Sequence, residues 1–201
     1  MLQRLKKPES HAVVCVAGNL EFRRGEPIYH AGAAGIAWRV MAGSVRLDRT
    51  EQEGVMFAGL AVKGDIIGAE SLLFGNYSFD AKALSDCALE PWQTDAARPV
   101  RDTLLETLAA AERRAADVVS LRCGQAADRV TRLIQLLAKE GAQKSAPQVA
   151  IPGIRDMAEI TDLTVETISR VISRLCKIGA LSRLGQRRVL LRQFPLQALP
   201  A

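Results

Sequence analysis

Three side chains with different hydrogen-bonding chemistry share one face of a helix that we expect over residues 165–177. Glu166, Ser169 and Arg170 recur at three- and four-residue steps, so they point the same way from a helix. An arginine can bind the N7 and O6 of guanine, a glutamate accepts from the cytosine amino group, and a serine can approach thymine. This face therefore predicts contact with base edges in a DNA major groove.

The opposite face of the same helix is apolar and predicts packing against a preceding helix. Its residues are Val165, Ile168, Val171, Ile172 and Leu175. Just upstream, Ala158 suits a close approach of two helices, and Thr164 is a candidate N-cap. Asp162 stands at the turn position that glycine often takes, and aspartate also tolerates the left-handed conformation. A solvated surface helix would also have a polar face, but these flanking features favour a helix-turn-helix.

Two short strands are expected after the second helix, over residues 181–184 and 188–191, and they predict a two-stranded wing. From residue 147 onward eight basic residues face four acidic ones, so this segment holds +4 of the chain's formal net charge of +5. A local basic excess attracts the phosphate backbone. The candidate DNA-binding residues are Thr164, Glu166, Ser169, Arg170, Ser173, Arg174, Arg183, Arg187 and Arg188.

Length and composition indicate ordinary globular material with room for two modest domains. The chain has 201 residues, of which 48% are hydrophobic and 24% charged. The apolar stretch at residues 12–17 is too short for a membrane span or a signal peptide. We therefore expect a cytoplasmic protein that does not enter a membrane.

The cysteines and histidines argue against a zinc site and against a cupin-type metal site. The four cysteines are scattered without a CxxC pair, which suits reduced thiols that serve packing: Cys15, Cys87, Cys123 and Cys176. A β-roll could also belong to a cupin metalloenzyme, but that site needs several His and Glu ligands. His11 and His30 are the only histidines in the chain, so we expect no such site and no enzyme activity.

The residue pattern between positions 12 and 95 is typical of β-strands, with short runs of branched and aromatic residues separated by glycines. This spacing predicts a small barrel or roll. After Pro99 the chain lacks Gly and Pro for a long stretch and is rich in Ala and Leu, which predicts a helix that ends near Gly124. A further amphipathic helix is expected over residues 126–139.

An apolar seam runs along the first of these helices and predicts a homodimer. Its residues alternate at four- and three-residue steps: Leu104, Leu108, Ala111, Ala115 and Val118. Two such helices lying side by side would form a two-fold dimer. Such a dimer presents two recognition helices to successive major grooves, so the target would be an inverted repeat.

The order of these parts resembles the CRP/FNR family of transcription regulators. The motifs that carry the resemblance are residues 22–26 (FRRGE), 43–47 (GSVRL), 64–68 (GDIIG) and 163–170 (LTVETISR). The last motif is the most specific, because it is similar to the recognition helix of the FNR branch. By this resemblance Glu166, Ser169 and Arg170 read the bases of a TTGAT-type half-site and its inverted partner.

The resemblance also implies an architecture and a partner. It predicts an α+β fold with a cyclic-nucleotide-binding-like β-roll over residues 1–98, a dimerisation helix over 99–123 and a winged helix-turn-helix over 124–201. It further implies contact with RNA polymerase, through an exposed loop of residues 74–77 (FGNY).

The signal that the β-roll would sense is left open by the sequence. Relatives that bind cyclic AMP hold its phosphate with an arginine, because a planar guanidinium matches the phosphate oxygens. Here residues 78–81 (SFDA) contain no arginine and Asp80 would repel a phosphate, so the sequence argues against cyclic AMP. Lys82 could substitute only as a point charge.

Of two metal cofactors found in relatives, the sequence argues against one and leaves the other open. The FNR iron-sulfur cluster needs several thiolates close together near the N-terminus, where Cys15 stands alone, so the sequence argues against that cluster. Haem stays open, with His11, His30 or a cysteine as a candidate axial ligand. A regulator without any ligand is equally open. A β-roll ligand module that does not bind DNA is the alternative function, and the presence of Glu166, Ser169 and Arg170 argues against it.

Overall fold

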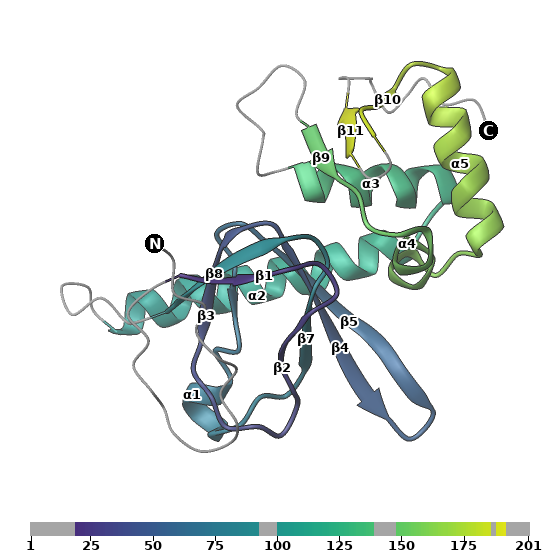
Figure 1. Ribbon diagram of the computed structural model, residues 1–201. Coiled ribbons are helices and arrows are strands. Elements are labelled where there is room, and N and C mark those ends of the chain that lie inside the picture. The colour runs from purple at the N-terminus through teal and green to yellow at the C-terminus, as the bar shows by residue number, and fades with distance from the viewer. Residues whose placement is uncertain (1–18, 93–99, 139–147, 186–187, 192–201) are drawn as a thin grey trace.

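The computed structural model of the chain describes residues 19–92, 100–138, 148–185 and 188–191. A β-roll comes first, a long helix follows, and a small helical unit with a three-stranded sheet completes the described chain (Figure 1). This arrangement confirms the predicted α+β fold with a roll, a long helix and a winged helix-turn-helix.

Eight antiparallel strands and one short helix make the roll. The strands are β1 (Leu20–Phe22), β2 (Pro27–Tyr29), β3 (Trp38–Ala42), β4 (Ser44–Glu51), β5 (Gly54–Val62), β6 (Ile66–Ile67), β7 (Asp80–Ala83) and β8 (Cys87–Pro91). They form two four-stranded sheets, ordered β1-β8-β3-β6 and β2-β7-β4-β5. Helix α1 (Ser71–Phe74) connects β6 to β7. Successive side chains of a strand point to opposite faces, and the inward positions Val40, Val45 and Leu89 are fully buried.

Two stacked tyrosines complete the interior of the roll. The rings of Tyr29 and Tyr77 lie 3.8 Å apart between centroids, and the Tyr77 hydroxyl donates to the carbonyl of Ile36 at 2.7 Å. Trp38 Nε1 donates to the same hydroxyl at 3.1 Å. Because Tyr77 is thus only 6% exposed, the prediction that it belongs to an exposed loop is wrong. Its hydroxyl finds partners inside the roll that the sequence did not reveal.

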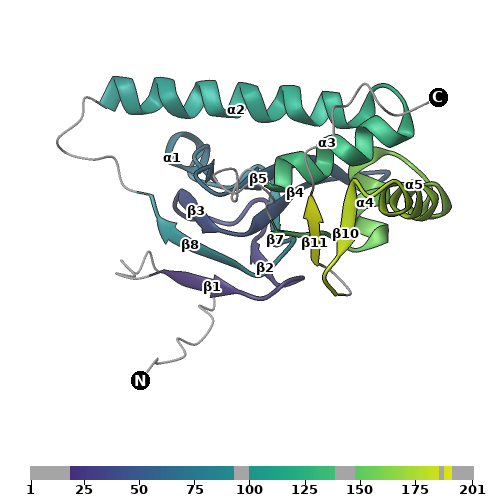
Figure 2. The same ribbon diagram turned by 90° about the horizontal axis from the view of Figure 1, so that it is seen from above.

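Helix α2 (Val100–Arg122) lies along one side of the roll (Figure 2). Arg114 of α2 pairs with Asp65, in the turn between β5 and β6, at 3.4 Å. Gly124 adopts the left-handed conformation with φ of 89°, which ends this helix and lets α3 (Ala126–Ala138) fold back. Within the described residues no helix is both long and apolar enough to cross a membrane.

The C-terminal unit contains β9 (Gln148–Ala150), α4 (Ile154–Thr161), α5 (Val165–Lys177), β10 (Leu181–Arg183) and β11 (Arg188–Leu191). The two predicted wing strands are confirmed, and they gain a third partner because β11 also pairs with β9. The sequence analysis did not predict β9. The core of this unit also includes Phe57, Leu60 and Leu84 of the roll, so one apolar cluster joins the two parts.

Gly68 is a position where the roll is sensitive to one added methyl group. Its φ is +70°, and a Cβ atom there would lie 2.6 Å from Cε1 of Tyr77. Gly75 has a similar φ of +79° but open space around it. We expect Gly68→Ala to lower the free energy of unfolding by about 2–4 kcal/mol, from backbone strain plus overpacking. We expect Gly75→Ala, the matched control, to cost about 1–2 kcal/mol from strain alone. Urea denaturation measures both values, and equal losses would contradict the packing around Tyr77.

Candidate nucleic-acid interface

Helix α5 turns one face into the protein and the other to solvent. Ile168, Ile172 and Leu175 are buried in the core, and Val171 packs partly against it. Val165 is 41% exposed, so the prediction that it belongs to the packed face is wrong. It begins the helix, one turn before Ile168, which is the first residue of α5 to reach the core.

The turn between α4 and α5 is built as the sequence predicts. Asp162 has φ of 53° and ψ of 52°, and its backbone N–H donates to the carbonyl of Ala158. Among the described residues it is the one non-glycine with positive φ. The hydroxyl oxygen of Thr164 accepts from the backbone N–H of Thr167 at 3.2 Å, which confirms Thr164 as the N-cap of α5.

The side chains predicted to read bases all lie on the solvent face of α5. We call Glu166, Ser169, Arg170 and Ser173 the polar strip, and each of them is exposed. The pKa of Glu166 is lowered by hydrogen bonds from its own backbone N–H and from the Thr164 hydroxyl. Glu166 is therefore ionised at neutral pH and can only accept hydrogen bonds, as contact with a cytosine amino group requires.

The basic side chains of this unit lie next to the polar strip in sequence and on the wing. Arg174, in the last turn of α5, is exposed, as are Arg183 at the end of β10 and Arg188 at the start of β11. The hairpin that joins the two strands is held by a bond from the N–H of Leu184 to the carbonyl of Arg188, 2.9 Å long. Arg187 lies outside the described residues.

The predicted seam on α2 divides between solvent and the interior. Leu108 is 57% exposed and Ala115 is exposed, but Ala111 is half-buried and Val118 packs against the chain's own core. Leu104 lies in the first turns of α2, where side chains are outside the described part.

The exposed apolar residues of α2 follow a slightly rotated register. We call Leu105, Leu108, Ala115 and Val119 the α2 strip, in which Leu105 is 55% and Val119 is 63% exposed. With Glu112 between them they recur at three- and four-residue steps, the spacing of a two-helix seam. Sequence reasoning missed Leu105 and Val119 because each follows another apolar residue, so the sequence fits two seams shifted by one residue. The packing of Val118 against the core excludes the seam that contains Val118.

Near α1 and β7, the carboxylates that could meet a ligand are bound within the roll. Glu70 accepts from the backbone N–H of Ser78 at 3.2 Å. Asp80 accepts from the N–H of Ala31 and the hydroxyl of Thr50, and the His30 ring lies 3.1 Å away. Burial acts to raise the pKa of Asp80, but these hydrogen bonds hold it below its ordinary value.

Burial also limits the reactivity of the Cys87 thiol. This residue is buried, and its burial raises the pKa of the thiol to about 11, with Asp86 and Glu26 adding to the effect. Across the described residues no group of three or more His, Cys, Asp or Glu side chains could hold a metal ion. His11 and Cys15 are not among those residues.

Comparisons with known proteins agree with this architecture. Residues 19–95 match the family model of the cyclic nucleotide-binding domain. FixK2 from Bradyrhizobium japonicum superposes with a TM-score of 0.70 at 26% identity, over 89% of this chain and 93% of that one. The chain has the fold and domain order of the CRP/FNR family of transcription regulators. The resemblance to this family that the sequence indicated is confirmed for the fold and the order of the domains.

Two further solved structures are similar, both from Thermus thermophilus. A transcriptional regulator of the CRP/FNR family superposes with a TM-score of 0.59 at 25% identity, over 88% of this chain and 94% of that one. A CRP-family transcriptional regulator gives a TM-score of 0.67 at 22% identity, over 87% and 92%. No curated protein matches the chain.

The N-cap of α5 can be tested by a conservative pair of substitutions at one position. Thr164→Ala removes the oxygen that binds the N–H of Thr167, so we expect the free energy of unfolding to fall by about 1 kcal/mol. Thr164→Ser keeps the hydroxyl and should stay close to the native value. Denaturant titrations followed by circular dichroism measure the difference, and identical midpoints for the two variants would argue against the cap.

Proposed function

We propose that this CRP/FNR-type chain is a homodimeric, sequence-specific DNA-binding transcription regulator, placed in the cytoplasm. The observation that carries the proposal is the polar strip of α5, which the buried opposite face holds outward. In the proposal α5 enters the major groove as the recognition helix of the helix-turn-helix. The family architecture, shared with transcriptional regulators over most of the chain, supports this assignment.

Three residues of the polar strip, Glu166, Ser169 and Arg170, have a chemistry that suits one base each. Arg170 would take N7 and O6 of a guanine, and Glu166 would accept from the amino group of the paired cytosine. Ser169 would approach a neighbouring thymine. The preferred half-site would then be of the TTGAT type, with its inverted partner in the other half of the operator.

Phosphate contacts would come from Ser173 of the polar strip and from exposed residues around it. Arg183 and Arg188 would follow the backbone from the wing, and Ser173, Arg174 and Thr164 would do so from α5 and its cap. Such contacts fix the position of the protein on the duplex without reading its sequence. They also make binding weaker as the salt concentration rises.

The α2 strip supports a dimer formed by a second copy of the chain. Three large apolar side chains are more than half exposed along it, and two such helices side by side would cover them. A two-fold axis along this seam would place two copies of α5 on successive major grooves, with half-sites about one helical turn apart.

Two further parts of the proposal concern a contact with RNA polymerase and the signal that the roll would sense. Contact with RNA polymerase would use residues 74–76, because Phe74, Gly75 and Asn76 are exposed whereas Tyr77 is not. A ligand or haem in the roll would act only by favouring one arrangement of the two recognition helices.

The alternative function is a β-roll ligand module without a DNA role. It predicts equal, weak binding to a TTGAT inverted repeat and to a random duplex.

Arg170→Ala tests the base-reading role. We expect it to lower affinity for the repeat by about 1–3 kcal/mol and to relax discrimination at the guanine position, while binding to a random duplex changes little. Arg39→Ala, an exposed arginine on β3, serves as the control. Fluorescence anisotropy with labelled duplexes measures these values. Equal losses of Arg170→Ala on specific and random duplexes would contradict the assignment.

Charged substitutions on the α2 strip test the proposed dimer seam. We expect Leu105→Glu with Leu108→Glu to give monomers, because an apolar seam cannot bury two carboxylates in each copy. Leu73→Glu is the matched control, since Leu73 on α1 is 77% exposed and lies outside the α2 strip. Sedimentation velocity measures the oligomeric state. A double variant that sediments like the native protein and the control would remove the seam.

A further inference from the structure

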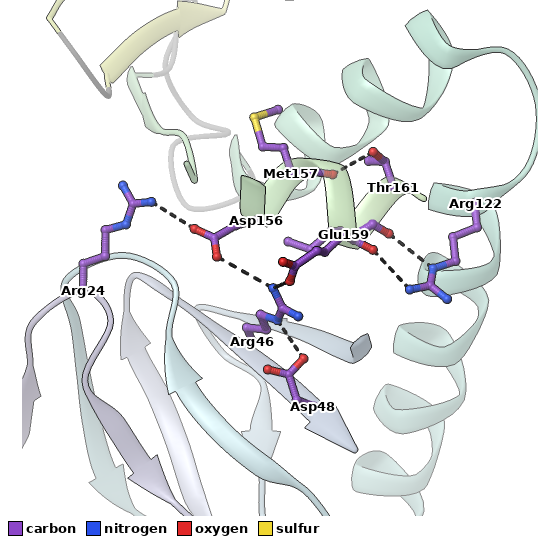
Figure 3. Close-up of polar contacts among 9 residues, drawn as sticks. Arg24, Arg46, Asp48, Arg122, Asp156, Met157, Glu159 and Thr161 are labelled. Atoms are coloured by element: carbon purple, nitrogen blue, oxygen red, sulfur yellow. Dashed lines mark hydrogen bonds and ion pairs between the residues drawn. The ribbon is translucent and has the colours of Figure 1, made fainter. Parts of the chain in front are cut away.

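Helix α4, the first helix of the helix-turn-helix, is bound to the roll by ion pairs from its first and second turns (Figure 3). Asp156 of α4 accepts from Nη2 of Arg24, which lies between β1 and β2, at 3.1 Å. Glu159, about one turn later, accepts from Nη1 of Arg46 at 2.6 Å. Arg46 belongs to β4, so a turn and a strand of the roll hold one short helix through its carboxylates.

Other arginines bind the opposite end of the same helix. Nη2 of Arg122, the last residue of α2, donates to the carbonyl of Glu159 at 3.2 Å, and its Nε donates to the carbonyl of Ile160 at 3.4 Å. Arg129 of α3 donates to the carbonyl of Thr161 at 3.3 Å. The last carbonyls of a helix lack partners within it, so these donors satisfy α4 from outside. Helix α4 is thus held at both ends.

Arg46 has the most demanding environment in this network. Its side chain is only 7% exposed, and besides Glu159 it contacts Asp48 at 2.7 Å and Asp156 at 3.7 Å. Burial acts to lower the pKa of Arg46, but its hydrogen bonds to Asp48 and Glu159 outweigh burial and the pKa is raised. Without Arg46, the side chain of Asp48, which is only 11% exposed, would lose its cation. Glu159 would lose its partner on the roll, while Asp156 would keep Arg24. Removal of one partner of a buried ion pair is far more disruptive than the net value of the pair.

A single aromatic ring joins the two sides of this network. The guanidinium carbon of Arg46 lies 5.9 Å from the ring centroid of Phe57, and that of Arg122 lies 5.5 Å from it. Phe57 is itself part of the core that contains Ile160 of α4. The roll, the end of α2 and α4 therefore meet at one point.

The position of α4 fixes that of α5. Ile160 of α4 and Ile168 of α5 are fully buried in one cluster, and the turn between the helices is only three residues long. Close-packed helices move together because an interior at this density has no room for one to slide alone. A contact that holds α4 on the roll consequently also holds the polar strip.

We propose that Arg46 is a positioning residue that couples the β-roll to the recognition helix, by holding α4 through Glu159 and Asp156. The proposal rests on the proposed function only for its effect on DNA. The coupling of the roll to α4 is independent of it. Arg46 contacts no base and acts through α4.

The test compares Arg46→Met with Arg49→Met on the same strand. Arg49 pairs with Glu51 at 3.2 Å, but both side chains are exposed and neither pairs with α4, so its loss should have little effect. Hydrogen exchange followed by mass spectrometry reports on peptides that cover residues 154–161. We expect Arg46→Met to raise exchange there by about tenfold or more, with no change in β3 and β8. Indistinguishable α4 exchange in the two variants would overturn the proposal.

Substitution of the α4 carboxylates separates coupling from loss of folding. Glu159→Gln should raise exchange less than Arg46→Met, because Arg46 keeps Asp48 and Asp156. Adding Glu159→Gln to Arg46→Met should cost less than the sum of the two single effects, since it removes a carboxylate that has already lost its partner on the roll. If Arg46→Met does not fold, Asp156→Asn with Glu159→Gln leaves the roll unaltered. Raised α4 exchange in that variant supports the coupling, and native exchange overturns it.

Binding to duplexes tests the consequence for DNA. The probes are TTGAT inverted repeats whose half-sites are separated by the native spacing or by one or two base pairs more or fewer. We expect Arg46→Met to bind the preferred repeat about tenfold more weakly and to discriminate less among spacings, because α5 is less firmly placed. A uniform loss at all spacings with native α4 exchange would overturn the positioning role. If the native protein does not prefer the repeat to random DNA, the proposed function fails, while α4 exchange still decides the coupling.

Discussion

The burial of one side of α5 is the constraint on which the proposed interface depends. Ile168, Ile172 and Leu175 lie in the same core as Ile160 of α4 and Ile134 of α3. A rotation of α5 about its axis that moved the polar strip inward would expose three branched side chains and bury a carboxylate and a guanidinium without partners. Each of those changes is costly, and together they leave one orientation. Hydrophobic packing, rather than any contact of the polar residues themselves, aims the strip at solvent.

The same core extends beyond the C-terminal unit. Phe57, Leu60 and Leu84 carry it into the roll, and Leu121 at the end of α2 lies within it. A change of shape in the roll therefore has a physical route to the helix-turn-helix, through packed side chains and the arginines that hold α4. The position of α2 beside the roll adds a second route, since the α2 strip would lie at the dimer axis.

Local patterns in the sequence predicted the elements, and long-range contacts decided what they do. The period of α5, the cap at Thr164 and the glycine-punctuated strands could be predicted because each depends on neighbours along the chain. The burial of Tyr77 could not, because its partners Ile36 and Trp38 come from a distant segment. Arg46 was part of a family-like motif, but its partner Glu159 is 113 residues away, so no local pattern indicated the contact. The sequence also could not show that Val119 rather than Val118 lies on the exposed face of α2, because Val118 packs against core residues that are distant in sequence.

The most direct test of the central claim is selection of bound duplexes from a random DNA library by the native full-length protein, followed by sequencing. The account predicts enrichment of a two-fold inverted repeat whose half-sites contain one strongly specified G·C pair beside thymines and lie about one helical turn apart. A folded protein that enriches no sequence, or that enriches a motif without two-fold symmetry, would contradict it.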